Sequence, residues 1–109
     1  MALIPDKNYF LADSDVLTMD YMYADVNNIM IMLGNHDMDR IADVVKDGDL
    51  RRVKLANVLM ATMRGIPQVF YGDEYGLKSS DRRLGHSTLR MPLPLGEQVT
   101  AEMQDMFDF

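Results

Sequence analysis

A chain of 109 residues, of which 48% are hydrophobic and 26% are charged, has the composition of a soluble α/β domain. Its net charge of -6 repels nucleic acid and anionic membrane surfaces, so neither is expected as a partner. The chain has no cysteine, which excludes a disulfide and a thiolate metal site, and no apolar run in it approaches the length of a membrane span.

The first ten residues contain one lysine and no long apolar core, so they lack the pattern of a secretory signal. Together with the lack of cysteine, this favours a cytoplasmic location. The segment from Tyr9 to Asp25 has only a broken helical pattern, which predicts the end of a preceding helix.

Five consecutive large apolar residues, from Ile29 to Leu33, predict a short strand. Alternate side chains of a strand point to opposite faces, so an unbroken apolar run predicts burial on both faces. Strands of this kind belong to parallel α/β sheets, in which ligands bind at the carboxyl ends of the strands. Asn35, His36 and Asp37 stand at that position, and all three can form hydrogen bonds with a ligand.

A helix is predicted from Leu50 to Arg64, with Asp49 as its N-cap. Its apolar stripe is so wide that few polar positions remain, which predicts a deeply packed helix. The apolar positions are Val53, Leu55, Ala56, Val58, Leu59, Met60 and Met63. Gly65 fits the C′ position after such a helix, because a left-handed conformation costs glycine little.

A second strand is predicted at Gln68–Tyr71, directly after Pro67. The 33 residues from Gly34 to Ile66 have the size of a βαβ crossover, so the two strands are expected to be parallel neighbours. A further short helix is predicted within residues 96–109.

Parallel neighbours place the polar residues that follow each strand at the same end of the sheet. His36, Asp37, Asp73 and Glu74 are therefore candidates for one site. Asp73 and Glu74 are interpreted chiefly as structural partners of backbone amides or of a nearby arginine.

Two motifs at a characteristic spacing resemble a known family. The residues LGNHDMDRI, from Leu33, and ATMRGIPQVFYGDEYG, from Ala61, resemble the last part of the catalytic barrel of the alpha-amylase family, glycoside hydrolase family 13. The resemblance covers about residues 27–76, and Leu89–Pro92 resembles the segment with a later arginine of the same barrel. It implies that the first motif closes the seventh barrel strand, that the second is the eighth strand, and that the substrates are alpha-1,4-glucans such as starch and maltooligosaccharides.

The resemblance also implies roles for individual residues. Asp37 would be the third family carboxylate, which stabilises the transition state by binding ring hydroxyls as the oxocarbenium ion develops. His36 would contact the same sugar, and Arg40 would reach the neighbouring glucose. Asn35 is expected to brace the loop, and Tyr71 to offer an aromatic platform beside the site. No metal and no cofactor is implied.

Retaining glycoside hydrolysis uses two carboxyl groups about 5 to 5.5 Å apart. The family takes them from its fourth and fifth strands, and this sequence contains neither. A complete barrel needs about 250 residues. The sequence therefore predicts an α/β fold that is a partial (β/α)8 TIM barrel: one parallel βαβ unit with flanking helical segments, in a single piece over residues 1–109 from the C-terminal part of the catalytic barrel.

The predicted function is that of a retaining alpha-glycosidase of the alpha-amylase type, present without the nucleophile and the acid/base residue. Because two strands alone are marginal in water, completion of the fold by self-association as a homo-oligomer is expected. The alternative is a non-catalytic, self-associating barrel piece that keeps part of a sugar site.

A remote alternative starts from residues 34–37 alone, because Gly-Asn-His-Asp also occurs in metallophosphoesterases, where the asparagine binds a metal. Those enzymes need an upstream Asp-x-His motif and a later histidine-rich motif. This chain has two histidines and none before His36, so it does not fit that pattern.

Overall fold

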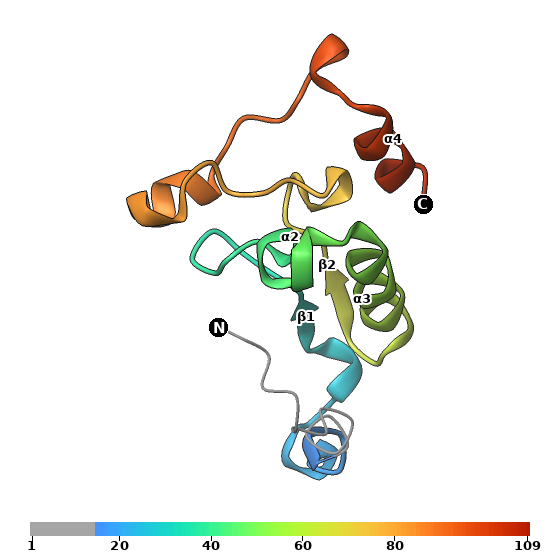
Figure 1. Cartoon of the computed structure of the whole chain (residues 1–109). Coiled ribbons are helices and arrows are strands. Elements are labelled where there is room, and N and C mark those ends of the chain that lie inside the picture. The colour runs from blue at the N-terminus through green and yellow to red at the C-terminus, as the bar shows by residue number, and fades with distance from the viewer. Residues whose placement is uncertain (1–14) are drawn as a thin grey trace.

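The computed structural model describes residues 15–109, except for the side chains of Arg82, Arg83 and His86. The elements are β1 (Met30–Met32), α2 (Ile41–Val44), α3 (Leu50–Thr62), β2 (Ile66–Gln68) and α4 (Ala101–Phe107), with 3₁₀ segments at Asp20–Met22, Val26–Asn28, Lys46–Gly48, Asp73–Tyr75, Arg82–Leu89 and Gly96–Gln98 (Figure 1). The predictions for the first ten residues fall outside this range.

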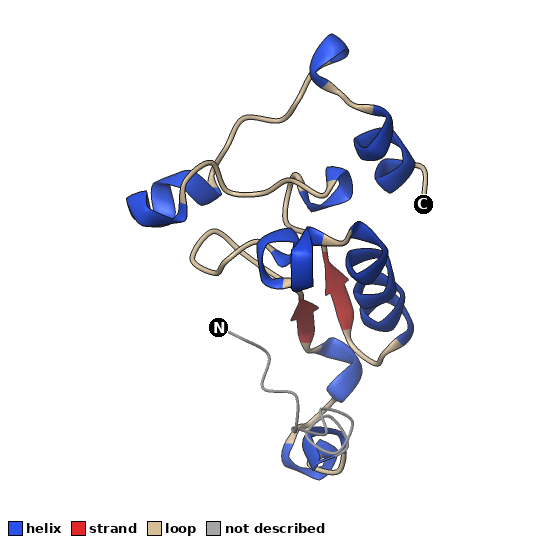
Figure 2. Ribbon diagram, in the orientation of Figure 1, coloured by secondary structure: helices blue, strands red, loops and turns tan. Residues whose placement is uncertain are grey.

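The two strands are parallel and adjacent, as the βαβ spacing predicts. Met30 pairs with Ile66 and Met32 pairs with Gln68. Both arrows point the same way in Figure 2, and α2 and several loops gather beyond their carboxyl ends. The polar residues that follow each strand are thus brought to one end of the sheet.

The second strand begins and ends earlier than the predicted Gln68–Tyr71. It starts at Ile66, whose N–H donates to the Ile29 carbonyl at 2.9 Å. Gly65 permits this approach: it has a φ of 111°, and a Cβ there would lie 2.6 Å from the Ile29 oxygen. The strand ends at Gln68 because its partner β1 ends at Met32, which leaves the following residues without a ladder.

The prediction that the first strand is buried on both faces is wrong for the described chain. The sheet of residues 15–109 has two strands. Met30 is 55% exposed and its partner Ile66 is 53% exposed, because residues 15–109 provide no covering layer on one side of the sheet.

Helix α3 begins as predicted and ends slightly earlier. The Asp49 side chain accepts a hydrogen bond from the Arg51 N–H at 3.0 Å, which is the expected N-cap. At the other end, the C-cap is Met63 in an extended conformation, so the prediction of Gly65 as the C′ residue is wrong. The positive φ of Gly65 serves the contact with Ile29 instead.

The apolar stripe of α3 is only partly covered, so the prediction of a deeply packed helix is also wrong. Within this helix Val53 and Met60 are buried, whereas Leu55, Val58 and Leu59 are exposed. A small core forms where α2, α3 and α4 meet, around Ala42, Val53 and Met106. Ile41, Val45 and Leu50 pack against it.

The segments at the two ends agree in part with the sequence. Residues 15–17 are helical and a 3₁₀ turn follows at Asp20–Met22, as a broken helical pattern predicts, while residues before 15 fall outside the description. Helix α4 lies inside the predicted range 96–109, and its N-cap Thr100 accepts from the Met103 N–H at 3.2 Å. Among residues 15–109 there is no helix of the length and hydropathy that crossing a bilayer requires.

Candidate active-site segment at the strand exits

The turn after β1 is held together by Asn35. Its side-chain oxygen accepts a hydrogen bond from the Asp37 N–H at 2.8 Å, and its amide group donates to the Met32 sulfur at 3.5 Å. Asn35 thereby connects the last residue of the strand with the residues that follow it. These two hydrogen bonds brace the turn.

His36 and Asp37 project from this turn into solvent, with side chains 58% and 64% exposed. The His36 Nε2 lies 3.1 Å from one oxygen of Asp37, and a terminal guanidinium nitrogen of Arg90 lies 3.5 Å from the other. The exposed carboxylate is therefore flanked by two hydrogen-bond donors. Such a group can accept hydrogen bonds from hydroxyls and favour a nearby positive charge.

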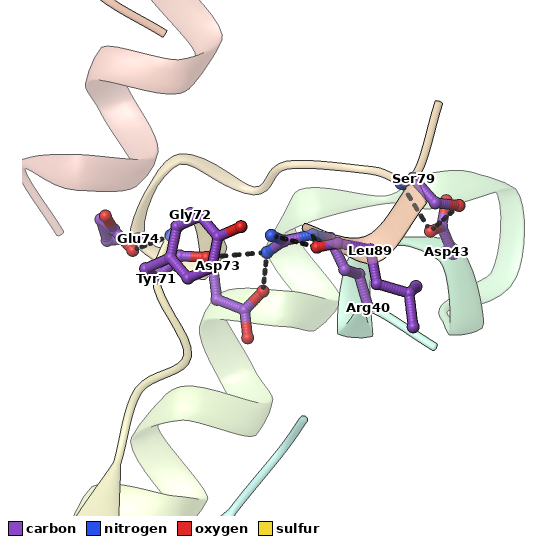
Figure 3. A network of polar contacts seen from close by, with 8 residues as sticks. All are labelled: Arg40, Asp43, Tyr71, Gly72, Asp73, Glu74, Ser79 and Leu89. Atoms are coloured by element: carbon purple, nitrogen blue, oxygen red, sulfur yellow. Dashed lines mark hydrogen bonds and ion pairs between the residues drawn. The ribbon is translucent and has the colours of Figure 1, made fainter. Parts of the chain in front are cut away.

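Arg40 lies at the opposite extreme of exposure, at 1%. Its Nε and Nη2 donate to the Leu89 carbonyl at 3.1 and 2.7 Å, and its Nη1 donates to the Tyr71 carbonyl at 2.9 Å. The same Nη1 lies 3.0 Å from a carboxylate oxygen of Asp73 (Figure 3). Every guanidinium nitrogen is thus engaged with the protein, and the Arg40 side chain is buried.

The two carboxylates after β2 face the protein, in line with their interpretation as structural partners. Asp73 is 4% exposed and pairs with Arg40. Burial raises the pKa of the Asp73 carboxyl, and the nearby Arg40 opposes that rise without cancelling it. Glu74 accepts a hydrogen bond from the Gly72 N–H at 2.7 Å. Neither therefore joins the exposed His36 and Asp37 as the four-residue site hypothesis required.

The turn that links β2 to Asp73 depends on Gly72. This residue has a φ of 91°, and a Cβ there would lie 2.6 Å from a Leu77 methyl carbon and 3.0 Å from the Arg40 Nη1. A side chain would disrupt the contacts of Arg40 as well as the turn.

Tyr71 contacts the buried Arg40 and also reaches the exposed surface. Its carbonyl accepts from the buried Arg40, while its side chain reaches the surface at 38% exposure. The ring packs edge-on against Phe70, with centroids 4.7 Å apart, and the Arg40 guanidinium lies 5.2 Å from the Tyr71 centroid. The Tyr71 ring is therefore held beside the strand exit by Phe70 and Arg40.

Two contacts of this end of the molecule were not predicted. Asp43 of α2 accepts hydrogen bonds from both the N–H and the hydroxyl of Ser79, at 2.8 and 2.7 Å, and so fixes the loop after the second turn (Figure 3). In the second contact, the Leu89 carbonyl accepts a hydrogen bond from the Arg40 Nε. The residues of each contact are distant in sequence, and one acceptor is a main-chain atom, so no local motif predicts these contacts.

Among the described residues, histidines and carboxylates do not gather in threes as a metal site would require.

Comparison with known proteins shows which family this chain resembles. A family model described as the alpha amylase catalytic domain matches residues 7–107. A 4-alpha-glucanotransferase of Thermotoga neapolitana is 36% identical over 70 residues, covering 64% of this chain and 16% of the relative. The alpha-amylase SusG of Bacteroides thetaiotaomicron is 32% identical over 98 residues, covering 86% of this chain and 14% of the relative.

A solved structure shows the same fold. The alpha-amylase of Geobacillus thermoleovorans, crystallised in complex with acarbose, superposes with a TM-score of 0.63 at 22% identity, over 86% of this chain and 21% of that chain. The chain thus spans between one seventh and about one fifth of the length of these proteins. It belongs to the alpha-amylase family, as a small α/β piece whose two parallel strands match part of the family's TIM barrel.

Proposed function

We propose that the exits of β1 and β2 form part of an alpha-glucan site of a retaining alpha-glycosidase, corresponding to the seventh and eighth barrel strands. The observation that best supports this proposal is the exposed Asp37 carboxylate, which is flanked by His36 and Arg90 on a turn that Asn35 braces. In this proposal Asp37 binds ring hydroxyls and stabilises the oxocarbenium-like transition state. His36 contacts the same sugar and Tyr71 provides an apolar platform.

Substrate binding is the activity that the described residues support by themselves. Retaining hydrolysis requires two carboxyl groups about 5 to 5.5 Å apart at the scissile bond. The two carboxylates after the neighbouring strand are committed to the protein: Asp73 pairs with Arg40, and Glu74 accepts from the Gly72 N–H. We therefore propose that this chain alone binds an alpha-glucan without cleaving it, and that the nucleophile and acid belong to other parts of a complete barrel.

Calorimetric titration with a maltooligosaccharide tests the binding. The wild-type chain should bind it, and Asp37→Asn should weaken binding by about tenfold or more, since hydrogen bonds to a charged group contribute about 1.5 to 3 kcal/mol. Asp105→Asn is the matched control, because Asp105 is an exposed carboxylate paired with Lys54 on another part of the surface. Equal affinities of wild type and Asp37→Asn would refute the role of Asp37.

An assay of reducing-end release tests the absence of turnover. The chain incubated with starch should release none above the level of a heat-denatured sample. Release that disappears in Asp37→Asn and persists in Asp105→Asn would show that this chain completes a catalytic site, and the binding-only proposal would fail.

Self-association is a separate part of the proposal. Met30, Ile66, Leu55 and Leu59 are apolar and at least half exposed, on the sheet and on α3. Burial of such surface in a second copy is favourable. Light scattering of the purified chain should give a mass above 12.5 kDa, and a monomer at all concentrations tested would remove this part.

A further inference from the structure

The Arg40 side chain touches the segment from which Arg90 reaches Asp37. Two of its nitrogens, Nε and Nη2, donate to the same Leu89 carbonyl oxygen at 3.1 and 2.7 Å. That oxygen belongs to the peptide unit that leads into Arg90. Arg90 in turn lies 3.5 Å from Asp37 through its Nη2. Arg40 and Arg90 are therefore connected through one peptide group, from a buried position to an exposed one.

The contacts of Arg40 exceed what neutralising Asp73 requires. The ammonium group of a lysine would be enough to pair with the Asp73 carboxylate. The planar guanidinium of Arg40 also donates to the Leu89 and Tyr71 carbonyls, which lie 49 and 31 residues away in the sequence. Its central carbon, Cζ, further lies 4.8 Å from the Phe70 ring centroid. These contacts fix the β2 exit and the Leu89 segment against the β1 exit, where Arg40 itself resides (Figure 3).

We infer that Arg40 is a positioning residue of the Asp37 site: by fixing the Leu89 peptide it holds Arg90 against Asp37. The functional meaning of this inference rests on the proposed sugar site, whereas the geometry does not. The competing explanation is that the buried Leu89 side chain, at 4% exposure, anchors the segment without help from Arg40. The two explanations differ in what happens to Arg90 when Arg40 changes and Leu89 stays.

The test is a comparison of NOEs between the Arg90 side chain and the His36–Asp37 side chains in the isotope-labelled full chain, without sugar. Arg40→Lys keeps a charge beside Asp73 and loses the paired donation to Leu89, so the NOEs should disappear. Arg40→Met/Asp73→Leu removes the buried charges together, which avoids an unpaired carboxylate, and should have the same effect. Asp73→Asn keeps Arg40 on Leu89, and the NOEs should persist, as they should in the surface control Lys54→Met.

The outcomes separate the explanations. Three results would overturn the inference. The NOEs could persist in either folded Arg40 variant, they could be lost in Asp73→Asn, or they could be absent from the wild type. Loss of the dispersed spectrum in both Arg40 variants would overturn it too, because the network would then support the whole chain rather than one segment. Addition of a maltooligosaccharide to the wild type tests the proposed function separately: no binding, with the expected NOE pattern, would remove the sugar site and leave the positioning role in place.

Discussion

Two polar regions at the carboxyl ends of the strands differ sharply in construction. The turn of residues 35–37 exposes the His36 and Asp37 side chains and is held mainly by contacts between residues one to three positions apart. The Arg40 network is buried, and its partners lie 31 to 49 residues away. We propose that the exposed region offers groups to a ligand and that the buried region positions those groups. Stability should therefore depend on the second region and ligand binding on the first.

The largest effect is expected from Arg40→Met. It leaves the buried Asp73 carboxylate without a partner, and removing one member of a buried pair costs about 3 to 5 kcal/mol. Urea unfolding followed by circular dichroism should show this loss. Arg40→Met/Asp73→Leu should be more stable than the single variant, since no charge is left unpaired. If the two were equally stable, the Arg40–Asp73 pair would not be the reason for the loss.

A pH dependence of stability should come next, and its sign follows from burial. The pKa of Asp73 is raised in the folded chain, chiefly by burial, so the folded chain keeps this proton to a higher pH than the unfolded chain. The contribution of the protonated Asp73 carboxyl to stability is complete below the pKa of Asp73 in the unfolded chain. It is lost as pH rises through the pKa of Asp73 in the folded chain. The free energy of unfolding of Asp73→Asn minus that of wild type should therefore increase from acid to neutral pH.

Asp49 provides a control of opposite sign for this series. A side-chain hydrogen bond from Arg51 lowers the pKa of the partly exposed Asp49 carboxyl. Its contribution is present above the unfolded pKa and lost as pH falls through the folded pKa. Asp49→Asn keeps a good N-cap and should become relatively more stable toward acid. Equal pH slopes for the two variants would contradict the assignment of Asp73 to the buried region.

Asn35→Ala should have a smaller effect on stability. It removes the hydrogen bond from the Asp37 N–H, and a typical hydrogen bond contributes about 1 kcal/mol. The same change should broaden the amide resonances of residues 36–38 in NMR spectra, because the brace of the turn is lost. An unchanged turn with an unchanged free energy of unfolding would mean that the neighbouring chain fixes it.

Asp37→Asn should change stability least. Its ion pairs with His36 and Arg90 are exposed, and such pairs contribute between 0 and about 1 kcal/mol. Its free energy of unfolding should stay within about 0.5 kcal/mol of the wild type, the range usual for surface substitutions. A loss as large as that of Arg40→Met would erase the distinction between the two regions.

The sequence predicted what local signals determine. The apolar run before Gly34, the N-cap Asp49 and the length of the crossover were sufficient for a strand, a helix and a parallel pair. The motif after β1 indicated which side chains stand at its exit. These features depend on a residue and its near neighbours, so a single sequence contains them.

The remaining features depend on partners that a local pattern does not specify. The apolar residues of β1 and α3 predicted burial, but burial requires a covering layer, which residues 15–109 do not supply for Met30 or Leu55. The bounds of β2 followed the end of its partner β1. Arg40 was expected at a sugar because of its place in a motif. Its carbonyl partners lie 31 and 49 residues away, so that motif could not predict them.

The central claim is that the exposed turn after β1 and the neighbouring Tyr71 bind an alpha-glucan. NMR titration of the labelled chain with a maltooligosaccharide tests it most directly. The largest shift changes should fall on Asn35, His36, Asp37 and Tyr71, and α4 should be unaffected. Saturable binding whose shift changes fall elsewhere, or no binding at millimolar sugar, would contradict the claim.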